Sequence, residues 1–280
     1  MVIDFHTHIF PDRIVRNRDD FLDDADFRAI YGSVKSRIVG GDGLLRAMDE
    51  NGIDAAVVMG FPWSDADRLW LHNDYLLESA SASGGRILPF CGLPVGEAGA
   101  VSRSVERART DGFAGIGEVA FYSTGLTAET ARILPSLFSA ARKAALPVCV
   151  HVNEPLGHRY AGKYATDFSM LYESIGAEAG LPIILAHWGG GILFYELMPE
   201  VKEAFADVYY DTAASPFLYR DEVYPAALSI TGVEKILFGS DYPLAGYRPY
   251  LDAMEAAPFS DIQRRAVMGE NARKLLGGIK

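Results

Sequence analysis

Two histidines one residue apart, His6 and His8, stand at the end of the first apolar run of the chain. Side chains of a β-strand alternate between its two faces, so both imidazoles point the same way, about 6.6 Å apart along the strand. Two imidazoles so placed can share one metal ion. The alternative is structural: one ring is buried and hydrogen-bonded, and the other marks the strand end. The pair alone leaves both interpretations open.

Ionisable side chains recur where five later apolar runs end. These residues are Glu118, His151, His187, Asp211 and Asp241. With His6 and His8 at the first run, four of the six histidines in the chain lie at the ends of apolar runs. Imidazole nitrogens with one or two carboxylate oxygens suit zinc, and also manganese, iron or cobalt. The sequence therefore predicts a catalytic site for a divalent metal, with Zn²⁺ as the first choice.

Each of these residues also has a structural alternative. His151 could be a hydrogen-bonded core histidine, and Asp241 a turn or helix-cap residue. Glu118 could bind the metal, hydrogen-bond a ligand of the metal, or be an ordinary strand-end carboxylate; Asp211 is the weaker candidate. His187 precedes Gly189–Gly191, which lets the backbone approach a ligand closely. A phosphate-binding loop is the rival interpretation there, but neither a P-loop lysine nor the dinucleotide spacing accompanies the glycines.

Basic and aromatic residues follow three of these strand ends. Arg159 lies in a loop after the His151 strand, Arg220 follows the seventh apolar run, and Trp188 is next to His187. Arginine pairs with carboxylates through two hydrogen bonds, so we expect these residues to hold a carboxylate-bearing substrate. Solvated surface is the alternative for the arginines. His72, which precedes a predicted helix, is expected to be solvated.

The elements that must position these residues alternate between short apolar runs and longer segments of helical period. This alternation is typical of a parallel sheet covered by helices. The predicted strands are Val2–His6, Ile53–Gly60, Ile87–Leu93, Gly115–Val119, Pro147–Val152, Pro182–His187, Val208–Asp211 and Lys235–Gly239. The helices expected between them are Gly43–Glu50, Asn73–Ser83, Val101–Thr110, Ala128–Ala144, Phe168–Ala179, Phe194–Phe205 and Tyr224–Ile230.

Eight strands with intervening helices predict an α/β fold, a distorted (β/α)₈ TIM barrel. An open doubly wound sheet is the alternative, but it collects its site near one switch point, whereas the candidates here run from the first strand to the last. A chain of 280 residues fits one barrel domain over residues 1–280. Residues 9–40 are expected to form a lid or insertion over the site, or an external packing segment. Helices expected at the end are Tyr250–Ala256, Asp261–Met268 and Ala272–Leu276.

The formal net charge of -11 disfavours a nucleic-acid partner but leaves room for a small anionic substrate. Cys91 and Cys149 fall in apolar runs and are expected to be buried thiols. The chain opens on the histidine strand without a secretory signal, and no apolar run approaches the ~20 residues of a membrane helix. We therefore expect a cytoplasmic protein with a small-molecule substrate and no membrane partner. A homo-oligomer is compatible with the sequence, which does not fix the oligomeric state.

The combined motifs resemble those of the amidohydrolase superfamily, in the branch called amidohydrolase family 2, which includes aminocarboxymuconate-semialdehyde decarboxylase and related aromatic-acid decarboxylases. The resemblance rests on His6-Thr7-His8 after Ile3-Asp4, on His151, on His187 before Trp188-Gly189-Gly190, on Gly239-Ser240-Asp241-Tyr242-Pro243, and on Gly269–Leu276 as a closing helix. It implies a divalent metal held by His6, His8, His151 and Asp241, with His187 as a base or hydrogen-bond partner. No lysine ends the fourth strand, which disfavours a carboxylated lysine between two metals. Glu118 takes that place and resembles the glutamate ligand of other branches, so a second metal stays open.

Two reactions follow from this resemblance and from metal chemistry. The first is hydrolysis of an amide, lactone or ester of a small carboxylate-bearing molecule by a metal-activated water. Asp241 would pass the proton to the leaving group, and His187 would orient the nucleophile or stabilise the oxyanion. The alternative is non-oxidative decarboxylation of an aromatic or enol-type acid, which the metal and Asp241 would polarise or protonate while Arg159 or Arg220 holds the carboxylate. A binding protein with an inert site ranks last.

Overall fold

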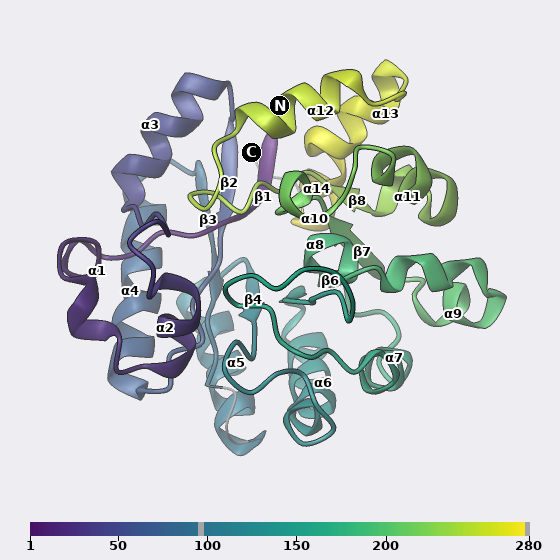
Figure 1. The fold of residues 1–280 in the computed structure, drawn as a ribbon. Helices are drawn as coiled ribbons and strands as arrows, with labels where there is room; N and C mark the ends of the chain where they lie inside the picture. Colours follow the sequence, from purple (N-terminus) through teal and green to yellow (C-terminus); the bar gives the residue numbers. More distant parts are fainter. Residues whose placement is uncertain (95–97, 278–280) are drawn as a thin grey trace.

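The computed structural model describes residues 1–94 and 98–277 and is built around a ring of parallel strands (Figure 1). Each strand pairs in parallel with the next along the chain, in the order β1 to β8. The strands are β1 (Ile3–Thr7), β2 (Ala55–Val58), β3 (Ile87–Cys91), β4 (Gly115–Val119), β5 (Val148–Val150), β6 (Ile183–Leu185), β7 (Val208–Asp211) and β8 (Ile236–Leu237). The predicted (β/α)₈ barrel is confirmed: seven of these strands lie within the predicted runs, and β1 extends one residue beyond its run, to Thr7.

The barrel is completed between β8 and β1 by isolated backbone hydrogen bonds. Phe5 N donates to Phe238 O at 2.7 Å, and beyond the strands His8 N donates to Tyr242 O at 2.8 Å. Asp241 N donates to His6 O at 2.9 Å between them. This irregular seam is the distortion of the barrel, and it brings the first and last predicted metal ligands together although 235 positions separate them in the chain.

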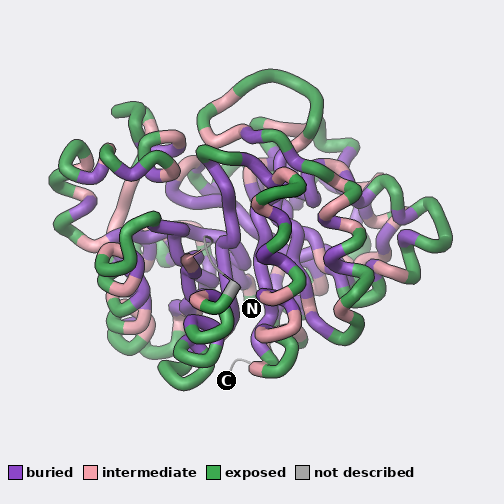
Figure 2. The backbone as a smooth tube through the Cα atoms, turned by 90° about the horizontal axis from the view of Figure 1, so that it is seen from below, coloured by how far each residue is buried: buried purple, intermediate pink, exposed green. Residues whose placement is uncertain are grey.

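Helices cover the outside of the ring, and their outer turns are exposed while the strands inside are buried (Figure 2). The helices between strands are α3 (Gly41–Asn51), α4 (Ala66–Ala82), α5 (Ala98–Asp111), α6 (Leu134–Ala144), α7 (Phe168–Gly176), α9 (Pro199–Ala204) and α11 (Val223–Thr231). Two short helical turns, α8 (Ala186–Gly189) and α10 (Ser215–Leu218), follow β6 and β7, and α12 (Arg248–Ala256), α13 (Asp261–Arg265) and α14 (Asn271–Leu275) close the chain. Among the described residues, no helix is long and apolar enough to cross a membrane.

Several helix boundaries differ from the prediction, and two of the differences have a clear local cause. Helix α4 begins seven residues before the predicted Asn73, because the Asp65 side chain accepts a hydrogen bond from Arg68 N at 2.8 Å and caps the first turn. The predicted helix Ala128–Ala144 is a 3-10 turn over Thr130–Ile133 followed by α6, with Pro135 in the first turn of α6. Neither difference moves a strand end.

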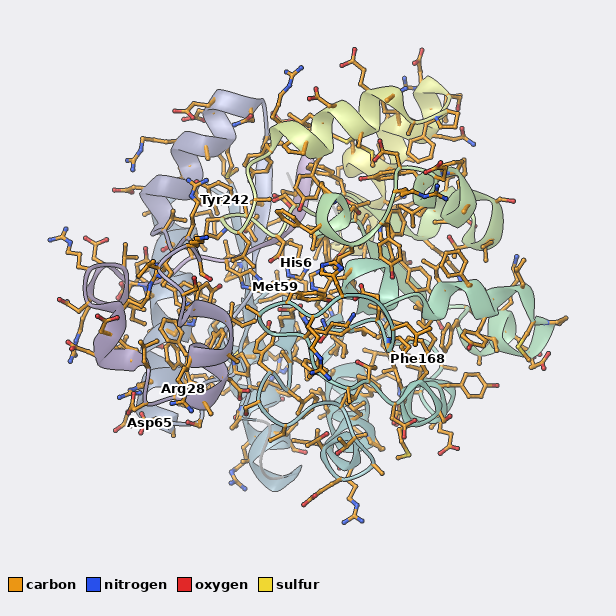
Figure 3. All side chains as sticks on the ribbon, in the orientation of Figure 1. His6, Arg28, Met59, Asp65, Phe168 and Tyr242 are labelled. Atoms are coloured by element: carbon orange, nitrogen blue, oxygen red, sulfur yellow. The ribbon has the colours of Figure 1, made fainter. Side chains whose placement is uncertain are left out.

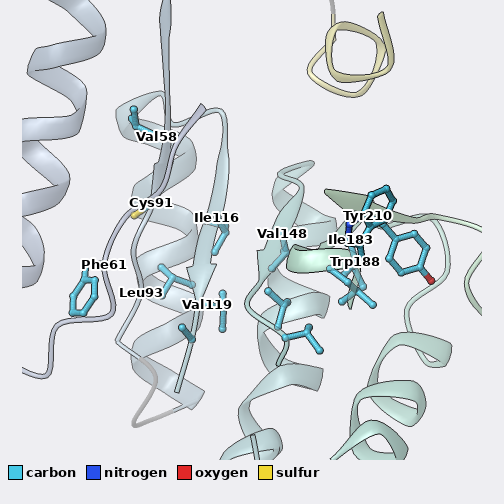
Figure 4. Close-up of a cluster of buried hydrophobic side chains, with 14 of the residues drawn as sticks. Val58, Phe61, Cys91, Leu93, Ile116, Val119, Val148, Ile183, Trp188 and Tyr210 are labelled. Atoms are coloured by element: carbon cyan, nitrogen blue, oxygen red, sulfur yellow. The ribbon is translucent and has the colours of Figure 1, made fainter. Parts of the chain in front are cut away.

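The alternation of side chains along the strands builds two apolar layers. Ile3, Phe5 and Phe90 belong to the smaller buried cluster, which includes residues from opposite sides of the ring. Val58 and Ile116 belong to the larger cluster, which includes the apolar faces of the helices (Figure 4). Cys91 and Cys149 are free and buried, as predicted. Strands buried on both faces explain why the runs are almost continuously apolar.

The segment after β1 folds as α1 (Asp12–Arg16), a 3-10 turn η1 (Arg18–Phe21) and α2 (Ala25–Tyr31), which lie beside α4 (Figure 1). Two aspartates anchor the first turn of α2. Asp24 accepts hydrogen bonds from Ser64 N at 2.9 Å and from Ser64 Oγ at 2.7 Å, and Asp26 accepts one from Ser123 N at 2.6 Å. The segment is therefore fixed to the loops that follow β2 and β4.

His72 is buried under this segment, which contradicts the expectation that it is solvated. Its ring stacks on Phe10 with 4.8 Å between centroids. Its Nδ1 accepts a hydrogen bond from Trp63 Nε1 at 3.2 Å, so its Nε2 carries the proton and donates to Ile9 O at 2.8 Å. The sequence pattern identified the helix and the insertion after the first strand, but not that this insertion covers His72. Burial lowers the pKa of His72 to about 4.

Acid should therefore destabilise the fold through His72. In the unfolded chain a histidine has a pKa of about 6.5. Between about pH 6.5 and pH 4, His72 therefore binds more protons in the unfolded chain than in the folded one. The neutral His72 ring therefore adds about 3 kcal/mol to the free energy of unfolding above this pH range. This stabilisation is lost as the pH falls through the range. Denaturant unfolding of the wild type and of His72→Gln, which keeps a donor and an acceptor, measures the difference. Curves that fall in parallel with pH would refute this role.

Candidate active site

A cavity of about 280 Å³ opens at the carboxyl ends of the strands. Its polar wall contains residues from five strand ends: His8, Glu118, His151, His187 and Asp241. The apolar and aromatic wall is formed by Ile30, Tyr31, Tyr122, Tyr160, Ala161, Ala214, Phe217, Leu218 and Leu244, and Asn153 and His158 complete it. His6 lies near the middle of the ring of elements (Figure 3). The structure therefore brings the histidines and acids predicted from strand ends to one place.

His6, His8 and Asp241 form the first cluster of donor atoms. Nε2 of His6 lies 3.2 Å from Nε2 of His8, and Asp241 Oδ1 lies 3.2 Å from His8 Nε2 and 3.8 Å from His6 Nε2. These three residues have the mutual spacing of a metal-binding group. Asp241 has a φ of 60°, an unusual conformation for a residue other than glycine, and such residues cluster at functional sites.

Asp211 fixes the orientation of the His6 ring from behind. Asp211 Oδ2 lies 2.8 Å from His6 Nδ1, and both side chains are fully buried. In a neutral ring the proton lies on Nδ1 and is donated to this carboxylate, so Nε2 turns its lone pair toward the first cluster. A carboxylate behind a histidine ligand is a common way to hold the ring for a metal.

His151 and His187 form the second cluster. Nδ1 of His151 lies 3.1 Å from Nε2 of His187. The backbone around His187 is held by Asp211 Oδ1, which accepts hydrogen bonds from His187 N at 2.8 Å and Ala213 N at 3.0 Å. Nδ1 of His187 lies 3.1 Å from the Ala213 carbonyl, to which it donates. Its Nε2 therefore faces His151 and Glu118.

Glu118 lies between the two clusters. Its Oε1 is 2.8 Å from His151 Nδ1 and 3.6 Å from both His187 Nε2 and His6 Nε2. Its Oε2 is 3.8 Å from His8 Nε2 and accepts a hydrogen bond from Tyr122 OH at 2.7 Å. One carboxylate thus faces all four histidines.

The electrostatics of the site balance buried acids against buried histidines. Burial alone lowers the pKa of a histidine, but Asp211 and Glu118 outweigh it and raise the pKa of His6 well above its usual value. Burial also lowers the pKa of His187, but Glu118 and Asp241 outweigh this effect and raise the pKa of His187 to about 9. In return, the histidines outweigh burial and hold the pKa of Glu118 well below its usual range. The buried carboxylates therefore stabilise a positive charge between the histidines of the site.

The donor set fits a divalent cation. Four imidazoles and two carboxylates converge, and the Nδ1 contacts of His6 and His187 turn the Nε2 atoms inward. Nitrogen and carboxylate oxygen together suit zinc, manganese, iron and cobalt. A cation supplies the positive charge that the acids demand, without a proton on the histidines.

The three residues predicted to bind substrate lie outside the cavity. Arg159 is exposed in the loop after β5. The Arg220 side chain is 88% exposed, and its Nε lies 3.8 Å from Glu222 Oε2. Trp188 is fully buried in the apolar cluster of Figure 4, where its Nε1 donates to Ser215 Oγ at 2.7 Å. The structure brings none of them to the two clusters.

Other residues line the site that the sequence did not single out. Tyr31 and Ile30 come from α2, and Tyr122 follows β4. Tyr122 stands four residues after Glu118, beyond the end of the strand, where strand periodicity gives no signal. Nothing in the sequence pattern indicated Tyr31, because the path of the segment after β1 cannot be predicted from its periodicity.

Weakening the contact behind His6 should weaken metal binding. Asp211→Asn keeps the shape of the side chain but removes the charge that holds the Nδ1 proton, so we expect metal affinity to fall about 10- to 100-fold. Competition with a chromophoric chelator measures it. Asp207→Asn, on an exposed residue just before β7, is the matched control. Equal affinities for wild type and Asp211→Asn would contradict this role.

Residues 3–278 match the sequence model of the family described as Amidohydrolase. The chain belongs to the amidohydrolase family. The resemblance in its motifs is thereby confirmed, and the chain is an enzyme, as predicted. No curated protein matches the sequence.

Solved structures of decarboxylases and of a hydratase share the fold of this amidohydrolase. A dihydroxybenzoic acid decarboxylase from Polaromonas sp. JS666, with bound manganese and 2-nitroresorcinol, has a TM-score of 0.77 at 20% identity over 99% of this chain and 96% of that chain. The 5-carboxyvanillate decarboxylase from Sphingomonas paucimobilis has a TM-score of 0.78 at 17% identity over 99% and 98%. The 4-oxalomesaconate hydratase from Rhodopseudomonas palustris has a TM-score of 0.69 at 16% identity over 99% and 96%. At these identities the likeness establishes the fold.

Proposed function

We propose that this amidohydrolase is a metal-dependent decarboxylase of a small aromatic or enol-type carboxylic acid. The observation that carries the proposal is the cavity itself, where metal-ligand side chains meet a wall of aromatic and aliphatic ones. A volume of about 280 Å³ lies just below the range usual for ligand sites and suits a single substituted ring. The decarboxylases among the structures of similar fold support the same reaction. Decarboxylation is thus preferred here to hydrolysis.

The residues proposed to hold the metal come from the two clusters and Glu118. His6, His8 and Asp241 would bind one divalent ion, and His151 and Glu118 a second, while His187 would contact the substrate. When bound, such an ion acts as a Lewis acid that draws electron density from a coordinated substrate oxygen. Manganese is present in a structure of similar fold, and Zn²⁺ is the ion first expected from the sequence, so metal analysis decides between them.

Decarboxylation replaces a carboxylate by a proton at one carbon. The bond between that carbon and the carboxylate carbon breaks, carbon dioxide leaves, and the carbon takes a proton. We assign proton delivery to Asp241, because it lines the cavity while its Oδ1 lies 3.2 Å from His8 Nε2. His187 would stabilise negative charge on the substrate, since Ala213 O fixes its ring and its Nε2 faces Glu118. The aromatic wall would exclude water from the ring.

Hydrolysis is the second candidate, and the position of Glu118 favours it. A carboxylate set between two pairs of histidines is the arrangement expected for two adjacent ions, which in many hydrolases act on the attacking and leaving oxygens. In that case Asp241 would take the proton from water and pass it to the leaving group.

One labelling experiment separates the two reactions. Metal-loaded protein is incubated with a panel of hydroxybenzoates and with lactones in H₂¹⁸O, and gas and products are analysed by mass spectrometry. Release of carbon dioxide, with no ¹⁸O in the remaining organic product, supports decarboxylation. Incorporation of ¹⁸O into a ring-opened product without carbon dioxide refutes it and supports hydrolysis.

A further inference from the structure

Tyr31, from the segment after β1, lines the cavity together with side chains from the strand ends. Its ring is 1% exposed and packs edge-on against Phe10, with centroids 5.0 Å apart. Phe27 and Phe61 pack on it as well, at 5.0 and 6.0 Å. Three aromatic neighbours fix the ring, so the hydroxyl is the one part of Tyr31 left for a ligand.

The Tyr31 hydroxyl is an unused hydrogen-bond donor. Among the described residues none forms a hydrogen bond with it. Burial, together with the charges of Asp241 and Glu118, raises the pKa of Tyr31 well above its usual value, so the hydroxyl keeps its proton. The other tyrosines of the wall are occupied: Tyr122 donates to Glu118, and Tyr160 donates to Glu154 Oε2 at 2.8 Å. A polar atom on this wall without a partner is best satisfied by the bound molecule.

The helix that carries Tyr31 is held in place. Its first turn is fixed through Asp24 and Asp26, as described above. At its other end, the Ile30 side chain packs directly on Gly162 of the loop after β5, where a Cβ would come within 2.0 Å of Ile30 Cδ1. A donor on a fixed element can discriminate between ligands, because it does not adapt to the wrong one.

The charges of the cavity wall limit which substrate groups can bind next to Tyr31. None of the described residues that line the cavity is a lysine or an arginine, and the one further ionisable base is His158 at the rim. Asp241 and Glu118 lie close enough to influence Tyr31. Away from the metal ligands, a second carboxylate on the substrate would thus find no lysine or arginine of the described lining to pair with, whereas a neutral hydroxyl needs no counter-charge.

We propose that Tyr31 is a specificity-determining residue that donates a hydrogen bond to a hydroxyl oxygen of the substrate. The inference rests on the proposed function for the substrate's carboxylate and narrows its class to hydroxylated aromatic acids with a single carboxylate. Acids with a second carboxylate are poor ligands of this cavity. The segment after β1 thereby selects the substrate, although the strand ends carry the chemistry.

Binding of three nitroarenes tests the proposal without any reaction. The probes are 2-nitroresorcinol, nitrobenzene and 2-nitrobenzoate, titrated by calorimetry into Mn²⁺-loaded wild type and Tyr31→Phe. The wild type should bind 2-nitroresorcinol more tightly than the other two. Tyr31→Phe, which keeps the ring packing, should raise the Kd of 2-nitroresorcinol about three- to tenfold and change that of nitrobenzene less than about twofold. Tyr224→Phe, at a buried tyrosine that does not line the cavity, is the matched control and should leave the preference for 2-nitroresorcinol over nitrobenzene unchanged.

Two results overturn the proposal. One is a wild type that binds 2-nitroresorcinol no better than nitrobenzene, or binds neither. The other is a Tyr31→Phe variant, folded by circular dichroism, with the wild-type preference. Because these probes lose no carboxylate, a Tyr31-dependent preference in a protein that releases no carbon dioxide from hydroxybenzoates would refute the proposed function and leave the role of Tyr31 intact.

Discussion

Asp241→Asn is expected to lower kcat about 10³- to 10⁴-fold, because the amide can neither deliver a proton to the substrate nor offer the charge that the first cluster needs. The asparagine is isosteric, so the seam between β8 and β1, where Asp241 N bonds to His6 O, should persist. Steady-state kinetics on the substrate found by the labelling screen measures the loss, with metal content determined in the same preparations.

The matched control is Asp211→Asn, which sits behind His6 and does not line the cavity. At saturating metal its kcat should recover, whereas that of Asp241→Asn should not. An Asp241→Asn variant with more than about a tenth of the wild-type kcat would remove Asp241 from the reaction.

Glu118→Gln is expected to bind one equivalent of metal where the wild type binds two. Its kcat should be lower by at least about 100-fold. The carboxylate faces both clusters, so its charge is shared between them, and an amide supplies neither the charge nor a second anionic oxygen. Elemental analysis by mass spectrometry after gel filtration gives the stoichiometry of wild type and variant.

Glu154→Gln is the control for this change, because Glu154 lies in the loop after β5 and hydrogen-bonds Tyr160 rather than the clusters. It should bind the same amount of metal as the wild type. One equivalent in the wild type, unchanged in Glu118→Gln, would show that Glu118 is not a ligand and that a single ion occupies the first cluster.

The barrel could be predicted because its strands are buried on both faces, which leaves an almost continuous apolar signal. The histidines and acids could be predicted for a related reason. Parallel strands put their carboxyl ends at one edge, so a polar residue that ends each apolar run marks that edge. His6 and Asp241 meet at the irregular seam for this reason, despite their separation in the chain.

The substrate wall could not be predicted in the same way. Arg159 and Arg220 follow strand ends in the sequence, yet both are exposed, because a loop turns its side chains without a fixed period. Trp188 is buried since the turn after β6 directs it into the core. Tyr31 and His72 depend on how residues 9–40 pack, and that packing is set by contacts with distant loops, such as those of Asp24 and Asp26.

The most direct test of the account is turnover of a hydroxybenzoate in D₂O by protein reconstituted with Mn²⁺ or Zn²⁺. A metal-dependent decarboxylase releases one carbon dioxide per turnover and places one deuterium on the carbon that carried the carboxylate. Chelation should abolish both signals, and added metal should restore them. Carbon dioxide release that survives chelation, or no release from any hydroxylated aromatic acid while a lactone or amide is hydrolysed, would contradict the account.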